Sequence, residues 1–152
     1  MVDWRVRDQV VCFTALSCSV FGLLRLGEFL PTGFTPAKTI STIYRHQVHT
    51  TYRFRALQTA TFNLPFDKSH QFEPAPPVVM GRCGRPFGAV EMLDFYLKSY
   101  RIPPQFPLFC SANGTAITAK DVIKFMRGKL LSLGEDPSCT RGTVVAREAL
   151  RA

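Results

Sequence analysis

The chain has 152 residues, of which 46% are hydrophobic and 20% are charged, a balance typical of a globular protein and not of a disordered one. A chain of this length is expected to form one domain with a sizeable core. Its formal net charge of +8 favours an anionic partner, with nucleic acid the first candidate. A basic surface without such a partner is the alternative.

The five cysteines are unevenly spaced and form no C-x-x-C pair, which excludes a zinc ribbon and a redox-active cysteine pair. Scattered unpaired thiols suit a reducing compartment, so we expect a nuclear or cytoplasmic protein. His46 and His49 lack the spacing and the adjacent glutamate of a zinc-protease helix, and no metal site is predicted. The sequence also lacks the glycine-rich motifs of nucleotide-binding proteins, so no cofactor is expected.

The first predicted element is a helix from Arg7 to Leu30, which Pro31 ends. Because no charged side chain occurs from Val10 to Leu24, this segment also imitates a secretory signal, but a buried core helix is the favoured interpretation. The apolar run is too short to cross a bilayer, and no membrane partner is expected. The expected core positions of this helix recur at spacings of three and four: Val10, Phe13, Leu16, Val20, Leu23 and Leu24.

The next segment, from Thr39 to Arg55, is basic and has aromatic residues among its cations. Arg45, Arg53 and Arg55 are candidate DNA-binding residues, because cations neutralise phosphates and aromatic rings stack on bases. A solvent-exposed strand or loop without a partner is the alternative.

Two strands are predicted next, at Leu57–Leu64 and at Pro77–Met80. The connector between them starts at Pro65, is rich in turn residues and can close an antiparallel pair. It places Lys68 at or near the tip of a hairpin, from which an amine can reach into a groove and protonate a leaving oxygen. An exposed, solvated lysine is the alternative.

A helix is predicted from Pro86, since proline suits a first helical turn. Its apolar stripe consists of Val90, Leu93, Leu97 and Tyr100.

A tight turn at Asn113-Gly114 precedes the last predicted helix, for which Thr118 is the N-cap and Asp121 completes a capping box. Lys120 in its first turn is a further candidate DNA-binding residue, and Gly134 is placed to end it. The order of elements predicts an α+β domain, mostly helical with a small antiparallel hairpin or sheet. The apolar face of this helix is expected at Val122, Met126, Leu130 and Leu133.

Arg25 and Glu28 end the long apolar run, within Gly22-Leu-Leu-Arg-Leu-Gly-Glu-Phe29. An arginine at the end of a buried helix is costly without a partner, and its planar fork fits phosphate best. The octet resembles the first arginine box of the tyrosine recombinase (phage-integrase) family, especially recombinases of eukaryotic mobile elements. Three later segments resemble the family's lysine region, its "PLF…G.PLT" segment and the approach to its second arginine box, in that order: Leu64–Gln71, Pro107–Thr118 and Leu131–Ser138.

This resemblance implies DNA strand cleavage and rejoining through a covalent phosphotyrosine. Arg25 would stabilise the charge that develops on the phosphate, and Lys68 would protonate the leaving 5′ oxygen. Glu28 would support the arginine box structurally.

The chain departs from the family pattern after Ser138, where a second arginine box and a nucleophilic tyrosine are expected. Neither histidine nor tyrosine follows Tyr100. We therefore expect residues 1–138 to form a partial catalytic domain, residues 139–152 to be a tail outside the family, and DNA binding to be non-specific and salt-sensitive without strand cleavage. Apolar surface uncovered by the missing helices predicts self-association. A small basic non-enzymatic binding module is the alternative.

A frameshift after about Ser138 is a hypothesis for the origin of this tail. Codon degeneracy permits a Gly-His-Ser run, close to the family's second box, when codons 139–146 are read out of frame. We expect the nucleotide sequence downstream of codon 138 to encode Gly-His-Ser-x-Arg in a shifted frame. A shifted frame without that run contradicts the hypothesis.

Overall fold

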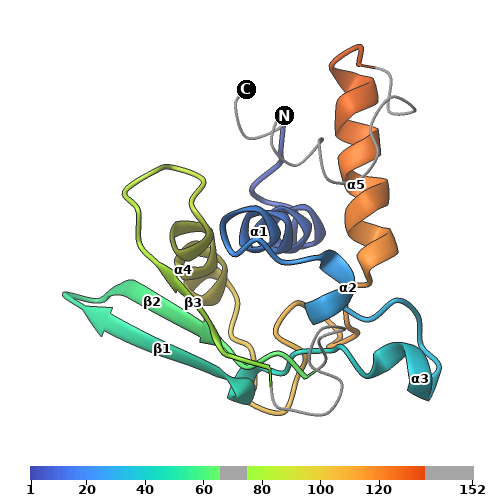
Figure 1. Ribbon diagram of the computed structural model, residues 1–152. Helices are drawn as coiled ribbons and strands as arrows, with labels where there is room; N and C mark the ends of the chain where they lie inside the picture. Colours follow the sequence, from blue (N-terminus) through green and yellow to red (C-terminus); the bar gives the residue numbers. More distant parts are fainter. Residues whose placement is uncertain (66–74, 136–152) are drawn as a thin grey trace.

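The computed structural model describes residues 1–65 and 75–135. Figure 1 shows α4 over the sheet, α1 beside α4, and α5 on the far side of α1. The α+β class predicted from the sequence is therefore confirmed. The elements in chain order are α1 (Arg7–Phe21), α2 (Leu26–Phe29), α3 (Pro36–Thr39), a 3-10 turn (Arg45–Gln47), β1 (Val48–Arg53), β2 (Ala56–Phe62), β3 (Val78–Gly81), α4 (Ala89–Ser99) and α5 (Ala119–Ser132).

The sheet has three antiparallel strands in the order β1-β2-β3. The predicted pair of strands is confirmed, since Phe62 lies opposite Val78 and Thr59 lies opposite Gly81. The basic segment before that pair supplies β1, which pairs with β2 at the edge of the sheet. The register between β1 and β2 shifts between Thr51 and Tyr52, as a β-bulge does.

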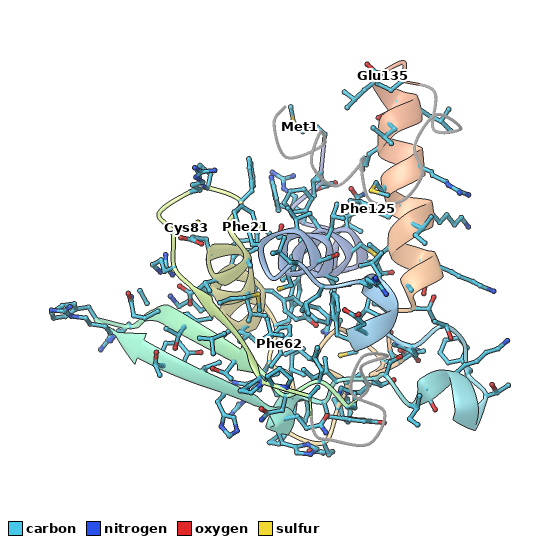
Figure 2. All side chains as sticks on the ribbon, in the orientation of Figure 1. Met1, Phe21, Phe62, Cys83, Phe125 and Glu135 are labelled. Atoms are coloured by element: carbon cyan, nitrogen blue, oxygen red, sulfur yellow. The ribbon has the colours of Figure 1, made fainter. Side chains whose placement is uncertain are left out.

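The core fills the space between the sheet and the helices. Phe62 on β2 is fully buried there and packs against Phe29 and Phe109, with ring centroids 6.3 and 6.4 Å away (Figure 2). On α1, Val10 and Cys18 have no exposed surface, which confirms the interpretation of this segment as a core helix. Within residues 1–65 and 75–135, none of the helices has the length and hydropathy needed to span a bilayer.

The prediction of one helix from Arg7 to Leu30 is wrong, because α1 ends at Phe21. The Leu24 N–H donates to the Ser19 carbonyl at 2.9 Å, which closes the last turn as in a Schellman motif. This motif puts Leu23 at a φ of 54°, and its side chain is 84% exposed instead of lying in the core. The chain then restarts as the short helix α2.

Gly22 explains why leucine occupies the left-handed position. A Cβ on Gly22 would lie 2.7 Å from the Cys18 carbonyl oxygen and 3.1 Å from the Met80 sulfur on β3. The glycine is therefore needed at the C-cap itself, where the helix end meets the sheet. The residue that follows must adopt positive φ whatever its side chain.

The two later helices follow their predicted signals more closely. Thr118 and Asp121 form the capping box of α5, with the Asp121 N–H donating to Thr118 Oγ1 at 3.2 Å and the Thr118 N–H to Asp121 Oδ2 at 2.9 Å. Gly134, at a φ of 80°, ends that helix as predicted. Leu133 is 66% exposed, so its assignment to the apolar face is wrong. The other corrected boundary is that of α4, which begins after Gly88 and not at Pro86.

Replacing Leu23 by glycine is expected to raise the free energy of unfolding by about 1 kcal/mol, because glycine adopts positive φ without steric cost. The leucine side chain is 84% exposed, so little buried surface is lost. Urea denaturation measures the change. Gly134→Leu, at the equivalent position of α5, is the matched control and should lower the free energy of unfolding by a similar amount. A destabilised Leu23→Gly protein contradicts the prediction.

Candidate nucleic-acid interface

The hairpin between β1 and β2 has an unusual turn. Arg53 pairs with Ala56, so Phe54 and Arg55 alone form the loop. Their φ angles are 50° and 61°, both left-handed, as a type I′ turn requires. Asn-Gly is the sequence that favours such a turn, and each other residue costs about 1–2 kcal/mol in this conformation. Phe54 and Arg55 are therefore not the residues that most favour the backbone conformation of this turn.

The side chains of this hairpin tip (Arg53, Phe54 and Arg55) are open to solvent. Phe54 is 89% exposed, and the Arg53 guanidinium carbon lies 5.3 Å from the centroid of its ring. Arg53 and Arg55 are also exposed. Figure 1 shows the tip projecting away from the helices, at the left of the view. The fold thus exposes two predicted DNA-binding residues together with the aromatic ring that lies between them in the chain.

The outer face of β1 continues from the hairpin tip. His49, Thr51 and Arg53 alternate along the strand on the face opposite the buried Val48. The Thr51 and Thr59 hydroxyls lie 2.6 Å apart, which joins this face to β2. The six residues of β1 span about 20 Å. We call His49, Thr51 and the hairpin tip the β1 row.

The charges carried by β1 and β2 are of one sign. The sequence contains no Asp or Glu between Glu28 and Asp67, a stretch that includes all of β1 and β2. Every ionised side chain of these two strands is therefore a cation. A surface of this kind favours an anionic ligand.

The other two predicted DNA-binding residues lie elsewhere. Arg45 is half-buried at the start of β1, where its Nη1 donates to the Val48 carbonyl at 3.5 Å. Lys120 is exposed on α5, which Figure 1 shows on the opposite side of the molecule from the hairpin tip. Lys124 and Arg127 are also exposed on α5, at helical spacing from Lys120. Sequence reasoning missed this pair, although their spacing was the signal for them.

Arg25 does not lie at the buried end of a helix, and that premise of the sequence analysis is wrong. It is exposed and immediately precedes α2, because α1 ended earlier. The Glu28 carboxylate accepts a hydrogen bond from the Arg25 backbone N–H at 2.9 Å, so Glu28 holds the first turn of α2. Within the described residues the Arg25 guanidinium meets no carboxylate. Its contact with phosphate stays a prediction.

Lys68 lies outside the described residues, and so does the domain boundary predicted at residue 138. The strands on either side of the Lys68 segment, β2 and β3, do form the expected antiparallel pair.

The tyrosines offer no evident nucleophile. The Tyr96 hydroxyl is buried and donates to the Leu108 carbonyl at 2.9 Å, and burial raises its pKa above the usual range. The Arg7 guanidinium carbon lies over the Tyr100 ring, 4.8 Å from the ring centroid. Tyr44, before the 3-10 turn, and Tyr52, near the end of β1, are both exposed.

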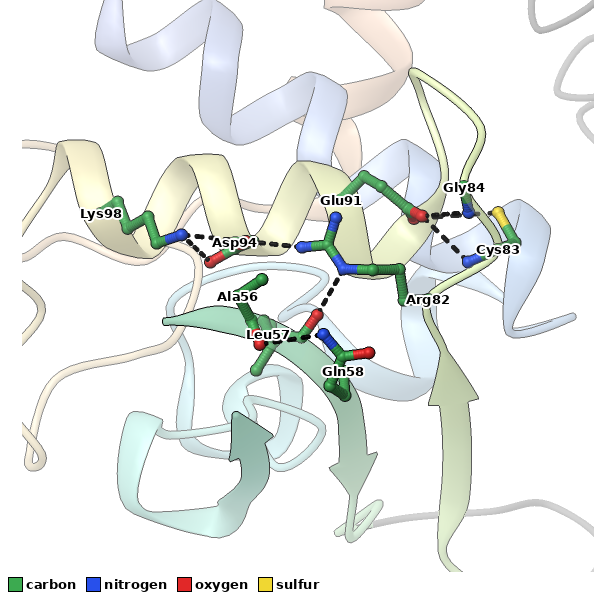
Figure 3. A network of polar contacts seen from close by, with 9 residues as sticks. All are labelled: Ala56, Leu57, Gln58, Arg82, Cys83, Gly84, Glu91, Asp94 and Lys98. Atoms are coloured by element: carbon green, nitrogen blue, oxygen red, sulfur yellow. Dashed lines mark hydrogen bonds and ion pairs between the residues drawn. The ribbon is translucent and has the colours of Figure 1, made fainter. Parts of the chain in front are cut away.

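Two basic residues near the sheet serve structure instead of a ligand (Figure 3). Asp94 is only 7% exposed, and its carboxylate lies 2.6 Å from Arg82 Nη2 and 3.0 Å from Lys98 Nζ. Arg82 Nε also donates to the Leu57 carbonyl on β2 at 2.6 Å. These cations are already paired and contribute little to binding an external anion.

A cavity of about 730 Å³ lies between α1, α5 and the turn before α5. Two carboxylates, Asp8 and Asp121, line it together with Lys124 and Lys129. Burial, Asp121 and Asp8 raise the pKa of Cys12 in its wall to about 12, so this thiol is neutral. The mixed charge makes the cavity a weaker anion site than the β1 row. Among the described residues, no three metal-ligating side chains gather at one place.

An aromatic cluster also reaches the surface, where Trp4 stacks on Phe87 and meets Phe13 and Phe95 edge-on. Trp4, Phe87 and Phe95 are 38%, 44% and 43% exposed. Apolar surface of this kind was expected, and self-association through it stays a prediction.

No protein-family model, curated protein or solved structure matches this chain.

Replacing Phe54 and Arg55 by Asn and Gly should raise the free energy of unfolding by about 1–2 kcal/mol, since these residues favour the type I′ turn. Urea denaturation at neutral pH measures the change. Arg53→Gln removes a charge from the same tip without altering either positive-φ residue, and should change stability less. A double variant no more stable than the parent contradicts the assignment of strain to this turn.

Proposed function

We propose that the protein binds DNA without sequence specificity, as an incomplete tyrosine-recombinase-like catalytic domain that does not cleave strands. The observation that carries the DNA-binding part is the β1 row, where Arg53 and Arg55 flank an exposed aromatic ring and neither β1 nor β2 contains a carboxylate. Guanidinium groups bind phosphate oxygens through paired hydrogen bonds. The exposed cations of α5 add a second phosphate-binding surface.

The recombinase part of the proposal rests on the resemblance and on the order of the elements. Arg25 follows the first core helix, the Lys68 segment connects the antiparallel strands β2 and β3, and Pro107–Thr118 leads into α5. This order agrees with the motifs that the sequence shares with the family. A nuclear or cytoplasmic location, expected from unpaired thiols, belongs to the same proposal.

A small basic binding module, unrelated to recombinases, is the second candidate. Two features favour this candidate: Arg25 is exposed, and the α5 cations lie on the opposite side of the molecule from the hairpin tip. Neither feature requires that these cations share one phosphate site. The two candidate functions make different predictions for a substitution of Arg25. The recombinase proposal expects Arg25→Gln to weaken DNA binding, and the binding-module proposal expects no effect.

DNA binding is tested by fluorescence anisotropy of a labelled duplex over a range of salt concentrations. The logarithm of the affinity should fall linearly with the logarithm of the salt concentration, because binding releases counterions. Arg53→Gln combined with Arg55→Gln should weaken binding and reduce the slope by about 2. No cleaved product should appear.

A matched control combines Arg5→Gln with Arg101→Gln, which removes the same charge from exposed arginines outside the β1 row. If this control reduces the slope equally, the β1 row is not the binding surface. If the parent protein binds no DNA even at low salt, the proposed function is wrong.

A further inference from the structure

We infer that the β1 row binds unpaired DNA, with Phe54 stacked on a base and Arg53 and Arg55 on the adjacent phosphates. This inference rests on the proposed function and specifies the form of DNA that the site takes. It starts from the conformation and exposure of the hairpin tip.

The fold does not account for a phenylalanine at position 54. Its ring is 89% exposed and therefore buries almost no apolar surface in the fold. Its backbone occupies the left-handed region, which disfavours phenylalanine. A residue that contributes neither packing nor turn stability is explained by what its side chain contacts outside the chain.

The neighbours of Phe54 identify the chemistry of that contact. Arg53 lies against the phenylalanine ring, and Arg55 follows Phe54 directly, so both neighbours of Phe54 in the chain are cations. A nucleotide offers the complementary pair of groups, a flat base and a charged phosphate. Stacking on an aromatic side chain accepts any base, since every base has a π-face.

The same geometry favours a single strand over a duplex. Bases in a duplex are stacked on one another and present only their edges in the grooves, so an aromatic face has nothing to stack on. An unpaired base is free to stack on Phe54. The outer face of β1 then offers a track of about 20 Å, on which His49 and Thr51 lie beside the phosphate backbone.

The site fits a membrane surface less well. A hairpin that enters a bilayer interface needs several apolar side chains together, as interfacial helices do. The outer face of β1 instead carries the polar His49 and Thr51, and Phe54 is the one apolar side chain of the hairpin tip.

The affinity of the full chain for an oligo(dT) of about 20 nucleotides and for a duplex of equal length, measured by anisotropy at one salt concentration, tests the inference. We expect tighter binding of oligo(dT). Phe54→Ala should weaken oligo(dT) binding at least fivefold, the lower end for loss of one stacked base, and change duplex binding less than twofold. Phe34→Ala, which truncates a 67% exposed phenylalanine outside the β1 row, is the matched control and should change neither.

Phe54→Trp separates stacking from a change in folding. It should retain oligo(dT) binding, and its fluorescence should be quenched on binding, whereas the parent protein, whose one tryptophan is Trp4, should show no such quenching. Equal effects of Phe54→Ala on oligo(dT) and duplex, or no quenching of the new tryptophan, overturn the inference while the proposed function stands. Absence of binding to either DNA overturns both. Binding to phosphatidylserine vesicles without binding to DNA assigns the tip to a lipid surface instead and overturns both as well.

Discussion

The carboxylate of Asp94 holds α4 on the sheet through its ion pair with Arg82. A buried carboxylate is stable only with charged or hydrogen-bonding partners, and Arg82 and Lys98 supply them at 2.6 and 3.0 Å. Arg82 also binds the Leu57 carbonyl, so one guanidinium joins β2, α4 and the segment after β3 (Figure 3). Removing both partners would leave a buried charge uncompensated. With α4 fixed in this way, the β1–β2 hairpin extends beyond the helices and its tip stays open (Figure 1).

Within residues 1–65 and 75–135, residues other than glycine occupy the left-handed region at two sites, and their causes differ. At the end of α1, the contact of Gly22 with Cys18 and Met80 shifts the strained position onto Leu23, so packing accounts for it. At the hairpin tip no packing contact requires Phe54 or Arg55. Strain that packing does not explain points to function, because strained residues cluster at active sites and ligand-binding sites.

Arg25 supports the recombinase proposal less strongly than its position in the sequence implies. Its exposure removes the argument that a buried guanidinium requires a phosphate. What remains for the recombinase proposal is the order of motifs along the chain, together with the pairing of β2 and β3 around the Lys68 segment. The DNA-binding proposal does not depend on that order, since the charge and exposure of the β1 row support it independently.

Local signals in the sequence were reliable where one turn of chain contains all the interacting groups. The Thr118–Asp121 capping box and the Gly134 helix end were predicted correctly, because their hydrogen bonds join residues a few positions apart. The end of the first helix at Phe21 was missed because the left-handed position after the C-cap is occupied by Leu23, a residue type that disfavours that conformation. The sequence does not distinguish a strand from a loop at β1, because this polar segment becomes a strand only by pairing with β2.

By itself, the sequence determined the α+β class, the basic character of the chain, its helix caps and the candidate cations. Only the tertiary structure decided which cations are neighbours. It placed Arg53, Phe54 and Arg55 at an exposed hairpin tip, separated Lys120 from them, and exposed Arg25. The physical reason is that composition and periodicity report on contacts within one element, whereas the grouping of surface charges depends on strand register and helix packing between residues distant in the chain.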